Sequence, residues 1–251
     1  MIPVSIIVIT KNEEHNIEAC LESARWAADI VVVDAESNDR TVEIARRYTE
    51  KIFIKPWMGF AAAKQFAVEQ SEHTWIFWLD ADERLLPESA AEIQTLIEQN
   101  PDHAAFTVAR RAYFLGRWMK HSGWYPGRVA RLFHKGRARF NFAAVHEGLE
   151  IRGSVGQLKH DLLHYTDPSI YHYFSKYNRY TTLAANELSE KGKKGHLSDM
   201  LIRPAWLFIK MYLLRLGFLD GMQGLLLAIF SSSYVFTKYA KLREMEFVQQ
   251  R

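Results

Sequence analysis

Two carboxylates, Asp80 and Asp82, come directly after an apolar run that begins at Trp75. The run is too short for a typical helix and indicates a buried strand, and open α/β sheets bind their ligands just beyond the carboxyl ends of such strands. If the extended geometry persists, both side chains project to the same side. Clustered carboxylates repel unless a cation joins them, and a hard divalent ion prefers one or two carboxylates plus substrate phosphate oxygens. The spacing predicts a metal-bound diphosphate; the alternative is a solvated loop after a strand.

Alternating strands and helices are expected to position this site. Apolar and β-branched runs predict strands over 4–9, 30–33, 52–54 and 75–80, and helical spacing or cap residues predict helices after 13, after 39, over 60–70 and over 87–100. The alternation favours right-handed βαβ crossovers and a parallel sheet. Because Thr10, Asp34 and Asp80 each end a strand, we expect them at the same edge of that sheet.

These strand-end residues suit a nucleotide ligand. A carboxylate such as Asp34 can accept the imide N–H of a uracil, and Thr10 can contact the same base. Lys64, on the helix before the Asp80 strand, can reach a diphosphate as a point charge. Each residue also has an ordinary interpretation, because strand ends, loop starts and solvated helix faces commonly carry Thr, Asp and Lys.

Composition sets the outer limits. The chain of 251 residues is 48% hydrophobic and 24% charged, which is typical of one large globular domain or a domain with an appendage. The single Cys20 excludes an internal disulfide and has no cysteine partner for a zinc cluster. A formal charge of +3 is too small to indicate nucleic acid binding without a recognised module. The first residues lack a basic segment and a cleavage site, so we interpret them as a core strand.

Several motifs together resemble a known family. The stretches 5–14, 32–41 and 78–83, which read SIIVITKNEE, VVDAESNDRT and WLDADE, resemble the family-two inverting glycosyltransferases with a GT-A fold. Further motifs at 145–147, 176–181 and 217–221 resemble the bacterial branch that adds a sugar to the lipopolysaccharide inner core, including its β-1,4-glucosyltransferases. The resemblance covers nearly the whole chain. It departs at Ala35 and Glu36, where relatives often carry a small residue and Gly, so the turn there is expected to differ.

The resemblance implies a GT-A, Rossmann-like fold with a mostly parallel sheet flanked by helices, and a C-terminal helical extension. It implies transfer of a sugar, with glucose from UDP-glucose preferred, onto a glycolipid acceptor whose accepting sugar is a heptose. In the family, the residue matching Asp34 binds uracil, the one matching Asp80 contacts the nucleotide, and the one matching Asp82 holds Mg²⁺ or Mn²⁺. Thr10 and Glu13 fall in the first motif and are assigned to the nucleotide sugar.

Glu147 is the candidate catalytic base. Inverting transfer needs one base to take the proton from the acceptor hydroxyl while a metal stabilises the leaving diphosphate. Many relatives carry an acidic pair here, whereas this chain has His146 first, so His146 is the alternative base or a metal ligand. His164 is a further candidate for metal or phosphate contact, with a structural role as its alternative.

A region after residue 115 is assigned to the acceptor. Trp118, His121, Trp124 and Tyr125 suggest aromatic faces on which a sugar stacks, although such residues also form ordinary cores. Arg128 and Arg131 begin a basic run that would attract a phosphorylated glycolipid, or would simply be a solvated face. Trp124, Arg128 and Arg131 are the acceptor-binding candidates.

The chain changes character after about residue 165, which predicts a catalytic domain over 1–165 and a helical region over 166–251. Apolar stretches from Pro204 onward, broken at Asp220–Gly221, alternate with cationic residues. We expect this region to hold the enzyme peripherally on the inner face of the bacterial inner membrane, in the cytoplasm, through apolar area and charge. The alternative is that its helices pack on the catalytic domain or form a homo-oligomer.

Three other functions fit the sequence less well. A sugar-1-phosphate nucleotidyltransferase would need a Gly-rich loop after the first strand, and residues 10–14 contain no glycine. A phosphatase with an Asp-x-Asp nucleophile would carry it at an early strand followed by Thr or Val, whereas Glu83 and Arg84 follow here. A membrane-associated nucleotide-sugar-binding protein without activity is made improbable by the combination of Asp80, Asp82 and Glu147.

Overall fold

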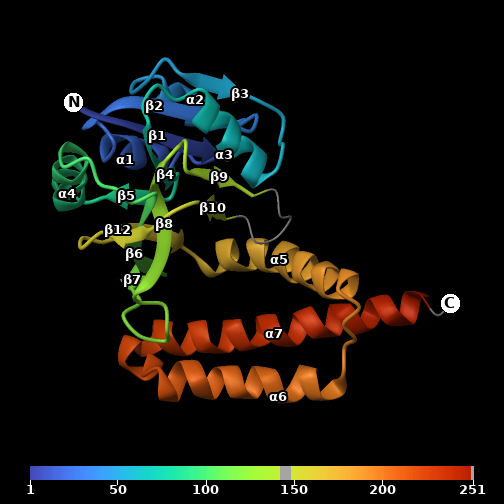
Figure 1. The fold of residues 1–251 in the computed structure, drawn as a ribbon. Coiled ribbons are helices and arrows are strands. Elements are labelled where there is room, and N and C mark those ends of the chain that lie inside the picture. Colours follow the sequence, from blue (N-terminus) through green and yellow to red (C-terminus); the bar gives the residue numbers. More distant parts are fainter. Residues whose placement is uncertain (142–147, 250–251) are drawn as a thin grey trace. The chain divides into compact units, whose positions relative to one another are not determined.

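The computed structural model describes residues 1–141 and 148–249, and the chain divides into two compact units (Figure 1). The first unit comprises Met1–Arg110 and Arg128–His164, and the second comprises Arg111–Gly127 and Tyr165–Arg251. The sequence placed 111–127 with the catalytic region. In the structure this segment belongs with the C-terminal helices, because His121 pairs with Asp220 (Nδ1 to Oδ1, 2.8 Å).

The first unit is an α/β sheet structure, and its elements follow the expected alternation. They are β1 (Ile2–Thr10), α1 (Ile17–Glu22), β2 (Ala27–Asp34), α2 (Thr41–Ala45), β3 (Ile52–Ile54), α3 (Phe60–Glu69), β4 (Trp75–Asp80), β5 (Glu83–Leu85), α4 (Pro87–Glu98), β9 (Ala138–Phe140), β10 (Leu149–Ile151) and β11 (Val155–Gln157). Three strands each contain residues of both units: β6 (Ala105–Phe114), β8 (Gly127–His134) and β12 (Leu162–Asp167).

The described strands form a sheet in the order β3-β2-β1-β4-β8-β6-β12-β5, and β9 pairs separately with β10. β1 is parallel to both β2 and β4, and β2 is parallel to β3, so the expected parallel sheet is present over these four strands. Beyond β4 the sheet becomes mixed, since β8 is antiparallel to β4. The α/β prediction is therefore confirmed, with a parallel half and a mixed half.

The continuous apolar character of β1 follows from its burial on two faces. Val4, Ile6 and Val8 belong to one core cluster together with Leu21 of α1. Ile7, which points the other way because side chains alternate along a strand, belongs to the cluster that contains residues of α3. Burial on both faces leaves only the strand ends for polar groups, and this places the functional residues at an edge.

The second unit is helical. It contains β7 (Arg117–Trp118), α5 (Ile170–Glu190), α6 (Leu197–Phe208), the π-helix η1 (Ile209–Leu214), the 3-10 helix η2 (Gly217–Asp220) and α7 (Gly221–Gln249). The predicted interruption near Asp220 is present, because Leu216 and Gly221 both take positive φ angles, of 54° and 65°. Helix α7 packs against both α5 and α6.

Among the described residues, one helical segment is long and apolar enough to cross a membrane by length and composition, and it runs from Gly217 to Phe247. Three of its polar residues, Ser233, Thr237 and Lys241, bond to its neighbour α5 in the second unit. Tyr177 Oη of α5 lies 2.9 Å from Ser233 Oγ and 2.5 Å from Thr237 Oγ1. Lys241 Nζ donates to Asn178 Oδ1 at 2.8 Å. One side of α7 is thus fixed to α5 by hydrogen bonds.

Candidate active site

The predicted convergence of strand-end residues is present. In the register of the parallel strands, Thr10 lies opposite Asp34, and Ile9 lies opposite Asp80. All three polar residues thus stand at the carboxyl edge of β1, β2 and β4, where an open α/β sheet binds ligands.

The loops that follow β1 and β2 are linked by reciprocal hydrogen bonds. The Asn12 N–H donates to Ser37 Oγ at 2.8 Å, and the Asn38 N–H donates to Asn12 Oδ1 at 2.9 Å. The Glu13 N–H donates to Thr41 Oγ1 at 2.8 Å. Asn12 takes a positive φ of 54°, a conformation that Asn tolerates better than most residues. The two loops therefore form one connected rim without any ligand.

Asp34 is fully buried and shapes this rim. Its Oδ1 accepts the Ser37 N–H at 2.8 Å, and its Oδ2 accepts the Ser37 hydroxyl at 2.5 Å. Across the register, Thr10 Oγ1 is buried and has no hydrogen-bond partner among the described residues. The Thr10 hydroxyl has unused hydrogen-bonding capacity, and the oxygens of Asp34 can each accept a further hydrogen bond. The two groups therefore suit a ligand that both donates and accepts hydrogen bonds, as a pyrimidine edge does.

Asp80 lies in a buried charge cluster. Arg131 Nη2 lies 2.6 Å from Asp80 Oδ2 and 2.5 Å from Glu83 Oε1, and the Arg131 side chain is only 2% exposed. The Trp78 indole N–H donates to Asp80 Oδ1 at 2.9 Å, and Lys64 Nζ lies 3.9 Å from the same oxygen. Both oxygens of Asp80 are thus engaged within the protein.

Trp78 also contacts the two cations through its ring. Lys64 Nζ lies 3.6 Å and Arg131 Cζ 3.9 Å from its ring centroid, within the range of cation–π attraction. Burial alone would raise the pKa of Asp80, but Arg131 and Lys64 hold that pKa well below its ordinary value. Burial raises the pKa of Glu83, and the charge of Arg131 opposes this only in part. Asp80 is therefore ionised and fixed.

The extended strand does not continue from Asp80 to Asp82, which departs from the geometry expected there. The chain turns at Ala81 and Asp82 before β5 begins at Glu83. The Asp82 carboxylate lies 3.4 Å from His164 Nε2 (Oδ2 to Nε2), and both side chains are partly exposed. The two carboxylates therefore have different partners, because Asp80 pairs with Arg131 and Asp82 pairs with His164.

The pair Asp82 and His164 has the donor chemistry of a metal site. Carboxylate oxygen suits Mg²⁺ and Mn²⁺, and imidazole nitrogen suits transition metals. Within residues 1–141 and 148–249, no group of three or more His, Cys, Asp or Glu side chains is arranged to hold an ion. The two groups fit an ion that takes its remaining ligands from a diphosphate and water, as divalent ions in phosphate sites do.

The acceptor-binding candidates lie in different surroundings. Arg131, expected to contact the acceptor as part of a basic run, is buried against Asp80 and Glu83. Arg128 is exposed in the first unit and donates to the Leu158 carbonyl at 3.2 Å. Trp124 lies in the second unit, where its ring packs at 6.3 Å from Phe114. Glu147 and His146 lie outside the described residues.

Sequence reasoning missed Glu83, Trp78 and Ser37. Glu83 follows Asp82 directly and looked like an ordinary loop residue, but it accepts the Asp80 backbone N–H at 3.1 Å. Trp78 looked like a core residue of the strand. Its position two residues before Asp80 was the available signal, since i and i+2 on a strand share a face.

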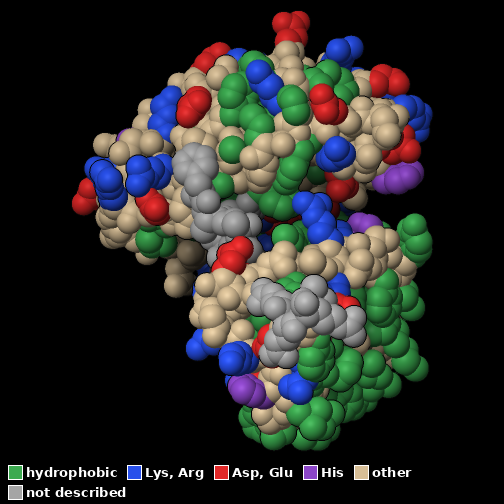
Figure 2. Space-filling view, turned by 90° about the vertical axis from the view of Figure 1, so that its right-hand side faces the viewer, with side chains coloured by type: hydrophobic (Ala, Val, Ile, Leu, Met, Phe, Trp, Pro, Cys, Tyr) green, Lys and Arg blue, Asp and Glu red, His purple; other side chains and the backbone are tan. Residues whose placement is uncertain are grey.

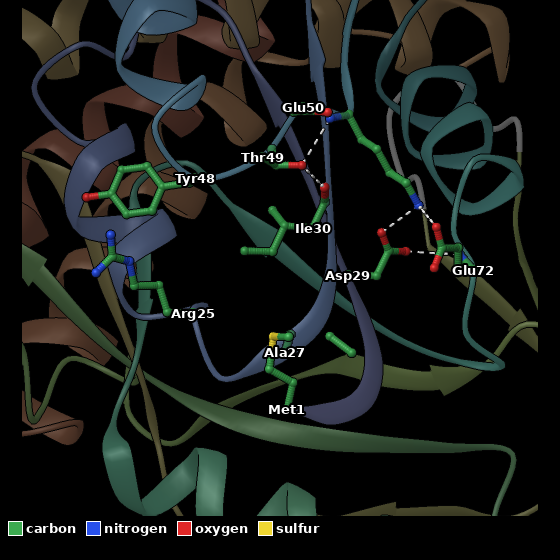
Figure 3. Close-up of a pocket in the computed structure, with 11 residues that line it drawn as sticks. Met1, Arg25, Ala27, Asp29, Ile30, Tyr48, Thr49, Glu50 and Glu72 are labelled. Carbon is green, nitrogen blue, oxygen red and sulfur yellow. Dashed lines mark hydrogen bonds and ion pairs between the residues drawn. The ribbon is translucent and has the colours of Figure 1, made fainter.

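A separate cavity of about 360 Å³ opens at the amino-terminal ends of β1 and β2 (Figure 3). Three of its charged groups are paired with one another, because Lys51 Nζ lies 2.8 Å from Asp29 Oδ1 and 2.5 Å from Glu72 Oε1. This cavity lies at the end of the strands away from Thr10, Asp34 and Asp80, so it is no part of the candidate active site.

Comparisons with known proteins agree with this geometry. The family described as "Glycosyl transferase family 2" matches residues 5–150. The chain is 30% identical to "Lipopolysaccharide core biosynthesis glycosyltransferase LpsC" of Rhizobium meliloti, over 100% of this chain and 95% of that protein. It is 29% identical to "Uncharacterized glycosyltransferase RT0209" of Rickettsia typhi, over 96% and 87% of the two chains.

The fold has a counterpart among solved structures. The mannosyltransferase PcManGT from Pyrobaculum calidifontis, in complex with GDP-Man and Mn²⁺, superposes with a TM-score of 0.59 at 15% identity, over 96% of this chain and 86% of that one. This likeness supports the GT-A arrangement of the strands. With a family match over more than half of its length and a full-length relative at 30% identity, the chain belongs to glycosyl transferase family 2.

Proposed function

We propose that the chain is a metal-dependent, inverting glycosyltransferase that moves glucose from UDP-glucose onto a heptose of the lipopolysaccharide inner core. The name of the Rhizobium meliloti relative supports the acceptor class, and its likeness extends over the whole chain. Such an acceptor is built on the cytoplasmic face of the inner membrane, so the enzyme would act there.

The main support for this proposal is that two kinds of polar group lie at the carboxyl edge of the sheet. Asp34 and Thr10 offer buried polar groups for a base, whereas Asp82 and His164 offer a partly exposed carboxylate and imidazole for a metal-bound diphosphate. Asp80 lies between these two parts in the strand order, fixed by Arg131 and Trp78. Along a nucleoside diphosphate sugar, the base and the diphosphate follow one another in the same order as these two groups of residues.

Each residue then has a chemical task. Asp82 and His164 would hold Mg²⁺ or Mn²⁺, which stabilises negative charge on the departing diphosphate when bound. Lys64 sits beside Asp80 and adds positive charge at the same edge. Glu147 would take the proton from the acceptor hydroxyl, with His146 as the alternative base. Trp124 and Arg128 remain the proposed acceptor contacts.

A donor screen tests the proposal. Purified full-length protein with Mn²⁺ and a heptose-terminated core glycolipid is offered UDP-glucose, UDP-galactose or ADP-heptose, and release of the free nucleotide and the mass of the glycolipid are measured. We expect a mass gain of one hexose with UDP-glucose, and an anomeric configuration opposite to that of the donor. Transfer from ADP-heptose alone, or retention of configuration, would overturn the donor or the mechanism respectively.

A further inference from the structure

Helix α6 exposes apolar side chains along its length, and no described residue of α6 is buried. Ile202 and Trp206 of α6 are four residues apart and therefore share one side of that helix, and Ile209 and Leu213 follow on η1; we call these four side chains the α6 stripe. They remain between 41% and 65% exposed. Hydrophobic side chains gather visibly on one side of the second unit (Figure 2).

The apolar surface continues past the end of η1. Leu214, Leu216, Phe218, Leu219 and Met222, which we call the tip, are all exposed and lie on or beside η2. A large exposed apolar surface on a soluble protein marks a contact with another molecule or with lipid. The stripe and the tip are contiguous along the chain, so one partner would cover both.

The charges around this surface identify the kind of partner. Asp220 is the only acidic residue from 200 to 243, and it is buried against His121. No acidic residue occurs from 111 to 127 either. Exposed cations border the stripe and tip: Lys210 and Arg215 from η1 and its end, and Arg117 and Lys120 from the segment at β7. A negatively charged partner is required to match them.

The cations are also held close to the tip. Arg117 Nη2 donates to the Leu219 carbonyl at 3.3 Å, and the Ser122 N–H donates to the Arg215 carbonyl at 2.9 Å. A second copy of the chain would bring the same cations together on both sides, which costs free energy by like-charge repulsion. An anionic bilayer supplies both hydrocarbon for the stripe and headgroups for the cations.

We propose that the α6 stripe and the tip form a docking surface for an anionic phospholipid bilayer, on which α6 lies in the plane of the interface. The long apolar α7 supports this surface and does not span the bilayer. Its Ser233 and Thr237 are hydrogen-bonded to Tyr177 of α5, and its Lys241 reaches Asn178, so insertion would sacrifice these contacts. Lys241 is one of the cationic residues that the sequence assigned to the membrane surface, and it instead donates a hydrogen bond to Asn178 within the second unit.

Single-cysteine probes locate the lipid contact. The native Cys20 is buried, so a polarity-sensitive fluorophore attaches selectively to an exposed cysteine introduced as Ile209→Cys or Leu219→Cys. Matched controls are Phe236→Cys on α7 and Ile54→Cys in the first unit, which replace side chains of comparable exposure. Vesicles of phosphatidylcholine with phosphatidylglycerol are added. We expect a blue shift at 209 and 219 only.

Binding strength gives a second measurement. Trp206→Ser with Ile209→Ser should weaken vesicle association at least tenfold, while Ile229→Ser with Phe236→Ser on α7 should leave it nearly unchanged. Lys210→Gln and Arg215→Gln should each reduce affinity about fivefold, which corresponds to about 1 kcal/mol per basic residue near an anionic surface. The reduction should disappear on vesicles of phosphatidylcholine alone.

Several results would overturn the proposal. A blue shift at 236 together with 209 would show that α7 enters the bilayer, and a shift without vesicles that grows with protein concentration would identify a second copy as the partner. Absence of vesicle binding by the full chain would remove the docking surface altogether. No donor or acceptor is present in these measurements, so their outcome is independent of the proposed glycosyl transfer.

Discussion

Arg131 Nη2 lies 2.6 Å from Asp80 Oδ2, and the same nitrogen lies 2.5 Å from Glu83 Oε1. One buried guanidinium thus joins the first carboxylate of the Asp-x-Asp motif to the carboxylate of Glu83. Arg131 Nε and Nη1 have no hydrogen-bond partner among the described residues. Its stabilising role therefore depends on Asp80 and Glu83.

Arg131→Met should lower the free energy of unfolding by about 3–5 kcal/mol, because two buried carboxylates would lose their cation. Urea unfolding measures the change. Arg139→Met is the matched control, since Arg139 is exposed and pairs only at the surface with Glu150. Adding Glu83→Gln to Arg131→Met should restore part of the stability. Equal stability of Arg131→Met and Arg139→Met would show that the cluster is not a stabilising one.

Asp82→Asn should abolish metal-dependent binding of UDP and reduce transfer by a factor of a hundred or more, with the fold intact. The amide keeps the shape of the side chain but removes its charge, and a divalent ion loses a carboxylate ligand. Calorimetric titration of UDP with and without Mn²⁺ measures the effect. Asp102→Asn, at a fully exposed carboxylate, is the control. Metal-dependent UDP binding that survives Asp82→Asn would exclude Asp82 as a ligand.

His164→Ala should weaken Mn²⁺ binding more than Mg²⁺ binding, because an imidazole nitrogen favours the transition metal over the harder ion. The metal concentration for half-maximal activity is measured with each ion. His160→Ala is a nearby control, since His160 pairs with Glu92 away from Asp82. An equal shift for both ions would indicate that His164 orients Asp82 without ligating the metal.

Glu147→Gln should leave donor binding intact and lower turnover by roughly 10²–10⁴-fold, the usual contribution of a general base. Single-turnover transfer and UDP-glucose affinity are measured side by side. His146→Ala serves as the comparison. If His146→Ala is inactive and Glu147→Gln is nearly normal, the two residues exchange roles.

Acid should destabilise the first unit through Asp29. Burial would raise the pKa of Asp29, but hydrogen bonds from Lys51, Ser5 and the Glu72 N–H hold that pKa below its ordinary value. The folded pKa is lower than the unfolded one, so the stabilisation is complete above about pH 4 and is lost as the pH falls through the folded value.

Urea unfolding at about pH 6 and about pH 3 measures this loss. Asp29→Asn should be less stable than the native chain at the higher pH, and the difference should shrink at the lower pH. Asp102→Asn should show no such convergence, because Asp102 is fully exposed. A constant difference between Asp29→Asn and the native chain would contradict the assignment.

The carboxyl edge of the sheet could be predicted from sequence because strands buried on both faces leave an unmistakable pattern. Continuous apolar runs ended by Thr10, Asp34 and Asp80 fixed both the strands and the edge at which they end. The break near Asp220 was visible for a similar reason, since Gly221 interrupts two apolar stretches.

Long-range pairing was not predictable in the same way. Arg131 looked like part of a solvated basic run, because nothing local reveals that β8 pairs with β4 and brings its side chain to Asp80. The segment 111–127 joins the helical unit through His121 and Asp220, which are 99 positions apart in the chain. The turn at Ala81 and Asp82 is a local feature that a two-residue period cannot anticipate.

The reciprocal hydrogen bonds between Asn12 and the Ser37–Asn38 segment constrain any attempt to change which nucleotide the enzyme uses. The Asn12 backbone N–H donates to the Ser37 hydroxyl and the Asn12 side chain accepts the Asn38 N–H, so replacing Asn12 or Ser37 alone breaks one of the two links. Engineered changes of base preference should therefore succeed as matched exchanges of the two loops and fail as single substitutions. The loops after β1 and β2 therefore have to change together. Libraries that vary both loops at once will contain functional donor sites far more often than libraries that vary one.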